Sequence, residues 1–470
     1  MSPEYVAEQP LSLRVIAAAL DGAFRFGPVS VREEALTVYD TFDGRLAAAG
    51  LAVAVTGPEA IPARARALAG RRALLELATV TVRTETVSLW DDLDKTVLRL
   101  ELISAPGLTP RVRLHGLRGY EAERALIFEL LALTEAPLSL TDEAILAAGG
   151  RPGGVRAKVR VSLNPGERSD AAVAAICLAL WEVVDANLPG TLADTDAEFL
   201  HDLRVCVRKT RSVLKELPGV WEPGERARWR EEFRWLQQIT GESRDLDVAL
   251  EDLDALAGLL EDETDRRALA PLATVIARRR AAARRIMVRE LRGGRARALG
   301  PAWTAALTGL PERSEADRPD GATPIGRLAA DRILAVARQM VKLGRAIGPD
   351  SAPEEYHTLR KHGKELRYLL ELFGLELGER EQIAPLLDAL KDLQEVLGRH
   401  QDREIQAHTL RGMAEEIAAL PGGAQALIAL GRLLGALAAD GADARGEFAA
   451  AFGAFAAKPQ QAALRTALGR

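Results

Sequence analysis

Hydrophobic residues follow different spacings in the first 150 or so residues and in the remainder of the chain. In the early part, several segments carry β-branched residues with partial two-residue alternation, as in Leu98, Leu100 and Leu102 against Arg99 and Glu101. These segments cover residues 35–41, 72–83, 95–103 and 111–114. The pattern predicts antiparallel strands, followed by a helix over residues 120–135.

From about Ser169 onward, apolar residues recur at intervals of three and four, and Ala, Leu, Arg and Glu dominate. This spacing predicts an all-helical domain. A Gly/Pro cluster at residues 149–154 marks the boundary, so we expect a β domain over 1–155 and a helical domain over 165–470. A polar, proline-bearing segment at 310–324 divides the helical domain into halves of about 165–310 and 322–470. The predicted fold class is therefore α+β multidomain.

The two helical halves repeat each other in sequence. TDAEFLHDLRVCVRKTRSVLKEL begins at Thr195, and SAPEEYHTLRKHGKELRYLLELF begins 156 residues later at Ser351. Thr195 with Glu198 and Ser351 with Glu354 predict capping boxes that start both helices at the same relative place. The matched basic residues are His201 with His357, Arg204 with Arg360, Arg208 with Lys364, and Arg211 with Arg367.

A second block repeats at an offset of 157, as LQQITGESRDLDV from Leu236 and LQEVLGRHQDREI from Leu393. It contains the duplicated acidic residues Asp245 and Asp402. A carboxylate suits pairing with a basic side chain better than contact with an anion, so these two are candidates for positioning the basic residues.

The spacing of the first block predicts a basic stripe on each helix, because positions i, i+3, i+7 and i+10 share one face over about 15 Å. A basic run on one helix is ordinarily a solvated face. However, the histidine repeated in register favours a ligand, because solvation has no need of imidazole. Four like charges repel one another, and a linear phosphate chain would relieve that repulsion while arginine grips it with two donors.

Other residues are weaker candidates. Lys215, Arg278, Arg285 and Arg289 could extend the basic surface, although the arginine-rich run from Ala277 has no counterpart in the other half. The histidines show no metal-ligand spacing, so no metal site is predicted. Cys177 and Cys206 lie in apolar helical patterns and are expected to be buried thiols.

Composition limits the function classes. The chain has 470 residues, 48% hydrophobic and 27% charged, with a net charge of −5, so any anion site must be a local patch. Only 4% of residues are aromatic, which leaves few stacking platforms for nucleic-acid bases. No apolar run approaches the length of a membrane span and no secretory signal is recognisable, so we expect a cytoplasmic protein.

The segments HDLRVCVRKTR, RDLDV, HTLRKHGKELRY and LKDLQEVLGRHQD resemble, in the same order, the conserved histidine α-helical domain, or CHAD. The resemblance implies two pseudo-symmetric four-helix bundles around a basic groove that binds inorganic polyphosphate, with location at polyphosphate granules in some bacteria. The binding residues carried over are His201, Arg204, Arg208, Lys209, Arg211, His357, Arg360, Lys361, Lys364 and Arg367. Glu365 stands where a basic residue would be usual, and Gln401 stands where an arginine precedes Asp245 in the first half, which would weaken the second half.

VYDTFDGRLAAAGLAVAV, from Val38, resembles a segment of the CYTH, or triphosphate tunnel, family. That family begins with an ExExK strand whose carboxylates hold divalent metal. Here we align PLSLRVIAAAL with that strand, and it lacks the triplet, so a degenerate tunnel-like domain without catalysis is expected. Arg83, Arg99, Glu101, Arg111 and Arg113 could line a tunnel or a solvated sheet face.

The sequence therefore favours a protein that binds polyphosphate in a basic groove and needs no cofactor. Two alternatives stay open. One is a metal-dependent tri- or polyphosphatase that uses the N-terminal domain. The other is a nucleic-acid binder, which the scarcity of aromatic residues weighs against. The sequence does not fix the oligomeric state.

Overall fold

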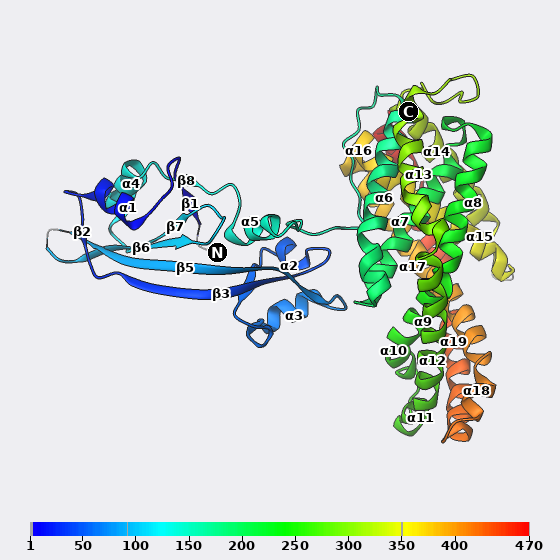
Figure 1. Cartoon of the computed structure of the whole chain (residues 1–470). Coiled ribbons are helices and arrows are strands. Elements are labelled where there is room, and N and C mark those ends of the chain that lie inside the picture. Colours follow the sequence, from blue (N-terminus) through cyan, green and yellow to red (C-terminus); the bar gives the residue numbers. More distant parts are fainter. Residues whose placement is uncertain (1–2, 92, 349–350, 470) are drawn as a thin grey trace. The chain divides into compact units, whose positions relative to one another are not determined.

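The computed structural model describes residues 3–91, 93–348 and 351–469. Its contacts divide the chain into two compact units, with the division between Arg156 and Ala157 (Figure 1). The first unit is an antiparallel sheet with short helices, and the second is helical. The predicted α+β organisation is confirmed.

The N-terminal sheet has the order β4-β3-β5-β6-β7-β1-β8, with β2 paired to β5, and all of its ladders are antiparallel. Leu98, Leu100 and Leu102 on β6 are buried while Arg99 is exposed, which is the predicted alternation. The strands are β1 Tyr5–Val6, β2 Arg25–Phe26, β3 Ser30–Thr41, β4 Val53–Val55, β5 Leu74–Trp90, β6 Thr96–Ser104, β7 Arg111–Gly116 and β8 Thr134–Glu135. The helices of this unit are α1 Leu13–Leu20, α2 Arg45–Ala48, α3 Ala63–Ala69, α4 Glu121–Leu130 and α5 Leu140–Ala147, with a 3-10 turn η1 Pro58–Ala60.

Two local predictions in this unit are wrong. The helix expected over 120–135 ends at Leu130, and Thr134–Glu135 form β8 against β1. The segment PLSLRVIAAAL is the helix α1 and not a first strand, because the Ser12 hydroxyl caps it by accepting from the Val15 amide at 3.2 Å. The first strand is instead Tyr5–Val6.

The helical unit begins each half with a long hairpin, α6–α7 in the first and α14–α15 in the second. The helices of the first half are α6 Ser169–Ala193, α7 Ala197–Glu216, α8 Pro223–Ile239, α9 Gly241–Glu251, α10 Leu253–Ala257, α11 Glu263–Ala268, α12 Ala270–Leu291 and α13 Gly294–Thr308, with 3-10 turns η2 Pro218–Val220 and η3 Leu310–Glu312. Those of the second half are α14 Ile325–Ala346, α15 Pro353–Leu369, a π-helical turn η4 Leu370–Gly374, α16 Leu375–Leu377, α17 Arg380–Arg411, α18 Ala414–Ala418, α19 Gly423–Phe455 and α20 Lys458–Ala467.

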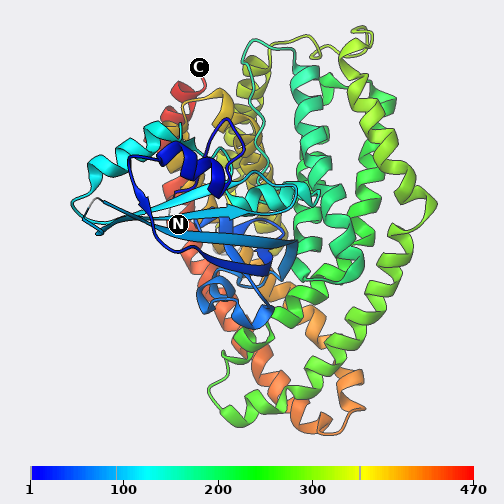
Figure 2. The same ribbon diagram turned by 60° about the vertical axis from the view of Figure 1, so that its left-hand side comes forward.

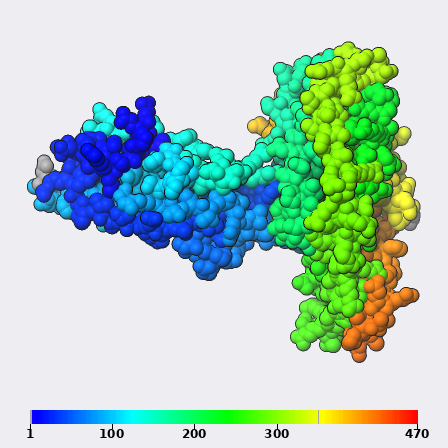
Figure 3. Space-filling model, viewed as in Figure 1, coloured from blue at the N-terminus to red at the C-terminus, as the bar shows by residue number. Residues whose placement is uncertain are grey.

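The two halves share a hydrophobic core at one end of the helical unit. Leu272, Val275 and Ile276 of α12 belong to the same buried cluster as Leu410 of α17 and Leu433 of α19. In Figures 1 and 2 the hairpin formed by α17 and α19 runs beside α12, and Figure 3 shows residues of both halves, green and orange, adjacent at that end. This shared core fixes the two repeats as one body.

Two helices are long and apolar enough to cross a membrane by composition alone, which the sequence reading did not anticipate. They are α6 and α19, and half of the apolar window of α6 is buried inside the protein. Its first turn contains Asp170, which is buried and ion-paired with buried Arg318 at 3.1 Å. Because α6 packs against α7 and α13 and holds a buried ion pair, we interpret it as a core helix.

Candidate functional site

The helices that carry the basic stripes, α7 and α15, begin at equivalent positions. The N-cap of α7 is Asp196, whose carboxylate accepts hydrogen bonds from the amides of Glu198 and Phe199. The N-cap of α15 is Ala352, 156 residues later, whose amide donates to the Glu355 carboxylate at 3.1 Å. The predicted caps at Thr195 and Ser351 are therefore wrong by one residue each, and the common register of the two helices is kept.

The two stripe helices contact each other through two reciprocal ion pairs. Lys209 Nζ of α7 lies 3.0 Å from Glu371 Oε2, just beyond the end of α15, and Lys215 of α7 is bound to Glu365 of α15. Lys209 and Glu365 are equivalent in the repeat, at an offset of 156, and so are Lys215 and Glu371. The lysine at each of these two repeat positions thus pairs with the glutamate that occupies the other repeat position in the second half. The contact is a pseudo-twofold seam in which one half supplies both lysines and the other both glutamates.

This seam changes the interpretation of Lys209, a predicted binding residue, and of Lys215, a candidate extension of the basic surface. Lys209 is buried, donates to the Ala157 carbonyl at 3.3 Å and lies over the Tyr368 ring. Lys215 is held by Glu365 and by Glu216. Both ammonium groups are therefore committed to carboxylates within the protein, so they lie in the seam rather than on the basic stripe. Glu365 replaces a basic residue because it completes the seam.

The duplicated arginines Arg204 and Arg360 reach the second repeated block. Arg204 is buried and donates through Nη1 to the Gln237 carbonyl and to Thr240 Oγ1, both at 2.8 Å. Arg360 donates through Nη1 to Gln401 at 3.2 Å and forms an ion pair with Asp402 at 3.0 Å. These contacts explain why the two blocks recur together along the chain.

A duplicated glycine makes room for each of these arginines. A Cβ on Gly241 would lie 3.7 Å from Arg204 Nη1, and a Cβ on Gly398 would lie 3.5 Å from Arg360 Nη2. Larger side chains at either glycine would press on the guanidinium. Burial, followed by the nearby charge of Arg208, lowers the pKa of Arg204 to about 10.

The histidines occupy equivalent places near the starts of the two helices, and both are partly buried. His357 Nδ1 is in hydrogen-bond contact with the Gln401 amide. Gln401, which was expected to weaken the second half, therefore holds His357 in place. Asp402 pairs with Arg360, and Asp245 lies near Arg204 and Arg208. His201 lies on α7 one turn before Arg204.

Charges from the two halves meet at Arg208 and Lys364. Burial, then the charges of Arg360 and of Arg208 from the other half, lower the pKa of Lys364 to about 8. Nε of Arg208 is buried without a hydrogen-bond partner among the described residues. Two equivalent cations of the repeat are thus close enough to repel each other, and the basic stripes form one cluster.

A pocket of about 460 Å³ opens beside this cluster between α15 and α17. Five cations and two carboxylates contribute to its wall, so its charge is positive. The lining residues are Arg360, Lys364, Arg367, Lys391, Gln394, Glu395, Gly398, Arg399 and Asp402. Lys361, by contrast, is exposed on α15 and does not line it.

Sequence reasoning missed a further duplicated cation, Arg234 of α8 and Lys391 of α17. They lie 157 residues apart, which is the offset of the second block, and each has an i,i+3 ion pair, with Glu231 and Asp388 respectively. Burial, then the charges of Arg234 and Arg230, lowers the pKa of Arg211, which places Arg234 beside the first stripe. Extending the second block two residues upstream would have found this pair.

The arginine-rich helix α12 does not act as one basic surface. Arg280 and Arg284 are bound to Asp194, so these two hold the α6–α7 turn. Arg278 lines a separate depression with residues from the start of α19, while Arg285 and Arg289 are exposed. None of these three lines the pocket between α15 and α17.

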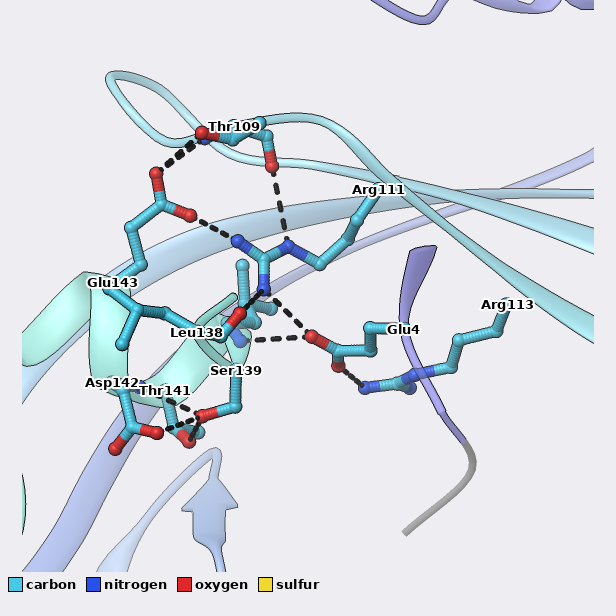
Figure 4. A network of polar contacts seen from close by, with 10 residues as sticks. Glu4, Thr109, Arg111, Arg113, Leu138, Ser139, Thr141, Asp142 and Glu143 are labelled. Carbon is cyan, nitrogen blue, oxygen red and sulfur yellow. Dashed lines mark hydrogen bonds and ion pairs between the residues drawn. The ribbon is translucent and has the colours of Figure 1, made fainter. Parts of the chain in front are cut away.

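In the N-terminal unit, a polar network surrounds Glu4, next to the first strand β1 (Figure 4). Glu4, next to β1, accepts from Arg111 Nη1 at 2.7 Å, from Arg113 and from the Leu140 amide at 2.9 Å. Arg111 is buried and also bound to Glu143. Among residues 3–91, 93–348 and 351–469, no group of three His, Cys, Asp or Glu side chains is placed to hold a metal ion. Through their bonds to Glu4, Arg111 and Arg113 neutralise its carboxylate beside β1.

Comparison with known families identifies the helical unit. A family model described as the CHAD domain matches residues 175–411, just over half of the chain, and includes both basic stripes. The chain belongs to the CHAD family. The CHAD domain of the plant Ricinus communis is similar in structure, with a TM-score of 0.53 and 25% sequence identity, covering 63% of this chain and 95% of that chain.

Two uncharacterised proteins of Mycobacterium tuberculosis are each 29% identical to the chain over 218 residues. The match covers 45% of this chain and 40% of each relative, so the chain spans less than half of their length. CHAD membership accounts for the helical repeat. The N-terminal antiparallel sheet is consistent with the expected CYTH-like tunnel fold.

Proposed function

We propose that this CHAD protein binds inorganic polyphosphate along the basic cluster formed by α7, α15 and α17. The observation that carries the proposal is the meeting of equivalent cations from the two halves, Arg208 and Lys364. A folded protein pays for such crowding in stability unless a ligand supplies the missing negative charge. The seam explains how the cations are brought together, because the Lys–Glu pairs hold the two stripe helices in contact.

The chemistry of the cluster suits phosphate. Arginine offers planar pairs of donors that match phosphate oxygens, and lysine meets them as a point charge. Arg204 and Arg360 are already oriented by contacts with α8 and α17, so little side-chain entropy is lost when they bind an anion. The buried Nε of Arg208, which has no hydrogen-bond partner in the part of the chain that the structure describes, supplies a further donor.

The repeat favours a long ligand over a short one. Each stripe is about 15 Å long, and the seam joins the two stripes near the ends of their helices. A chain of phosphates that engages one stripe is therefore tethered close to the other, which raises its effective concentration there. A cytoplasmic location, with association with polyphosphate granules, follows as part of the same proposal.

A direct titration tests the proposal. Long-chain polyphosphate is added to the full chain at two salt concentrations, and heat or fluorescence reports binding. We expect affinity to fall steeply with salt, as for other proteins that neutralise linear polyanions. Arg208→Gln with Lys364→Met should remove most of the affinity, while Arg14→Gln with Lys95→Met, the same charge change at exposed sites in the other unit, should not.

Competition separates polyphosphate from nucleic acid. The described residues that line the basic pocket include no aromatic side chain on which bases could stack. RNA should therefore displace polyphosphate poorly at equal phosphate concentration. Efficient displacement by RNA, or unchanged binding in the Arg208 and Lys364 variant, would contradict the proposal.

A further inference from the structure

A second basic pocket lies on another face of the helical unit, between α14 and α20. It has a volume of about 730 Å³, within the range of small-molecule sites, and is open to solvent. Five cations contribute to its wall, Arg338, Lys342 and Arg345 from α14 and Lys458 and Arg465 from α20. No aspartate or glutamate is among its lining residues.

This pocket is separate from the basic cluster at the seam. Met340 of α14 faces α15, because a Cβ on Gly363 of α15 would lie 3.3 Å from Met340 Cε. At about 100° per residue, Arg338, Lys342 and Arg345 lie roughly 140–200° around α14 from Met340. The cations therefore point away from the stripe helix.

The charges of the pocket are not part of the internal repeat. The residues 156 positions before Arg338, Lys342 and Arg345 are Glu182, Ala186 and Pro189, none of which is basic. The duplication that built the two stripes thus does not explain these cations.

Ion pairing within the protein does not account for these five cations. Elsewhere in the helical unit many arginines are paired, whereas these five make no ion pair within residues 3–91, 93–348 and 351–469. Arg345 and Arg465 lie in the last turns of their helices, where the helix dipole favours a cation. Lys458, however, is the first residue of α20, where the dipole opposes a positive charge.

We infer that the pocket between α14 and α20 is a second anion site, which binds a short inorganic oligophosphate such as tripolyphosphate. Its volume would accommodate a small ligand, and five cations match several phosphate charges. Val341, Ala456 and Ala462 form the apolar part of the wall, and no aromatic residue lines it. A nucleotide base would therefore find no stacking partner, so a nucleoside triphosphate should bind no more tightly than tripolyphosphate.

Calorimetric titration of the full chain with tripolyphosphate tests this inference. The site variant is Arg345→Gln with Arg465→Gln, and the matched control is Arg14→Gln with Arg64→Gln, which removes two exposed arginines of the other unit. We expect the site variant to lose affinity on the order of tenfold for each guanidinium removed, and the control to bind like the wild type. Both substituted arginines of the site are exposed, and an unchanged circular dichroism spectrum reports that the site variant is folded.

The variant Arg208→Gln with Lys364→Met separates the two sites. If both proposals hold, this variant keeps the tripolyphosphate binding that Arg345→Gln with Arg465→Gln removes. If the seam cluster does not bind polyphosphate but the second site is real, the wild type still binds tripolyphosphate, and Arg345→Gln with Arg465→Gln still weakens that binding. Equal affinity of the wild type and the α14–α20 variant, or an equal loss in the control, would overturn the second site.

Discussion

Replacing Lys364 with methionine should stabilise the unliganded protein while weakening its binding of polyphosphate. A pKa that falls from the ordinary 10.5 to about 8 corresponds to about 3 kcal/mol against the charged ammonium, because each pH unit is worth about 1.4 kcal/mol. Methionine keeps the length of the side chain and removes the charge. Since neighbouring groups relax, we expect the free energy of unfolding at pH 7 to rise by about 1–2 kcal/mol.

The pH dependence of stability gives an independent check that the charge of Lys364 destabilises the folded protein. Below pH 8 Lys364 is charged in both the folded and the unfolded chain, so the full free-energy cost of its charge in the folded protein is present. Between about pH 8 and 10.5 the unfolded chain binds a proton that the folded chain has released, so wild-type stability rises with pH relative to the variant. Polyphosphate favours the charged form, so wild-type affinity should fall as the pH rises through 8.

Urea unfolding and calorimetric titration at pH 7 and pH 9 measure both effects. Lys364→Met should bind long polyphosphate on the order of tenfold more weakly at pH 7, with a smaller difference at pH 9. Lys95→Met, an exposed lysine of the other unit, is the control. A variant that is less stable than the wild type and binds polyphosphate equally well would refute the reasoning.

Further perturbations test the seam, the N-terminal network and a buried thiol. Glu365→Lys should destabilise the helical unit in urea by leaving Lys215 against a like charge. Adding Lys215→Glu should restore only part of the stability, because this second change also loses the contact with Glu216; additive effects would exclude a direct pair. Arg111→Met should cost about 3 kcal/mol in urea unfolding because it removes a buried guanidinium from the partly buried carboxylates of Glu4 and Glu143, and a loss below 1 kcal/mol would contradict this. Burial alone would raise the pKa of Glu4, but its arginine partners outweigh burial and lower it. The stability that the ionised Glu4 gives the folded protein should therefore be lost as the pH falls below about 4.5. Acid unfolding followed by circular dichroism should depend less on pH in Glu4→Gln, and a profile identical to the wild type would contradict the assignment. Burial raises the pKa of Cys206 to about 12, so alkylation should require unfolding, and rapid labelling of native protein would contradict its burial.

Sequence alone predicted the features that depend on local periodicity and on the repeat. The strand at residues 95–103 and the hairpin helices that carry His201 and His357 could be found because alternation and helical spacing are local properties. The cap positions were missed by one residue, because Thr195 and Asp196 are both good caps and only the packed backbone selects Asp196.

Residues whose role depends on a partner from the other half could not be assigned from spacing. Lys209 and Lys215 share the basic character of the stripe, but they face Glu371 and Glu365 across a contact that exists only after the halves pack. The pocket between α14 and α20 was invisible for the same reason, since Arg338 and Lys458 are 120 residues apart.

The dependence of affinity on chain length tests most directly whether the two stripes form one polyphosphate site. Affinity is measured for a series of polyphosphate lengths with the wild type, Arg208→Gln and Lys364→Met. The account predicts that wild-type affinity rises with length until the chain spans both stripes, and that either single change flattens this rise while affecting the shortest chains less. A full rise with length in either variant would contradict a site shared by the two halves.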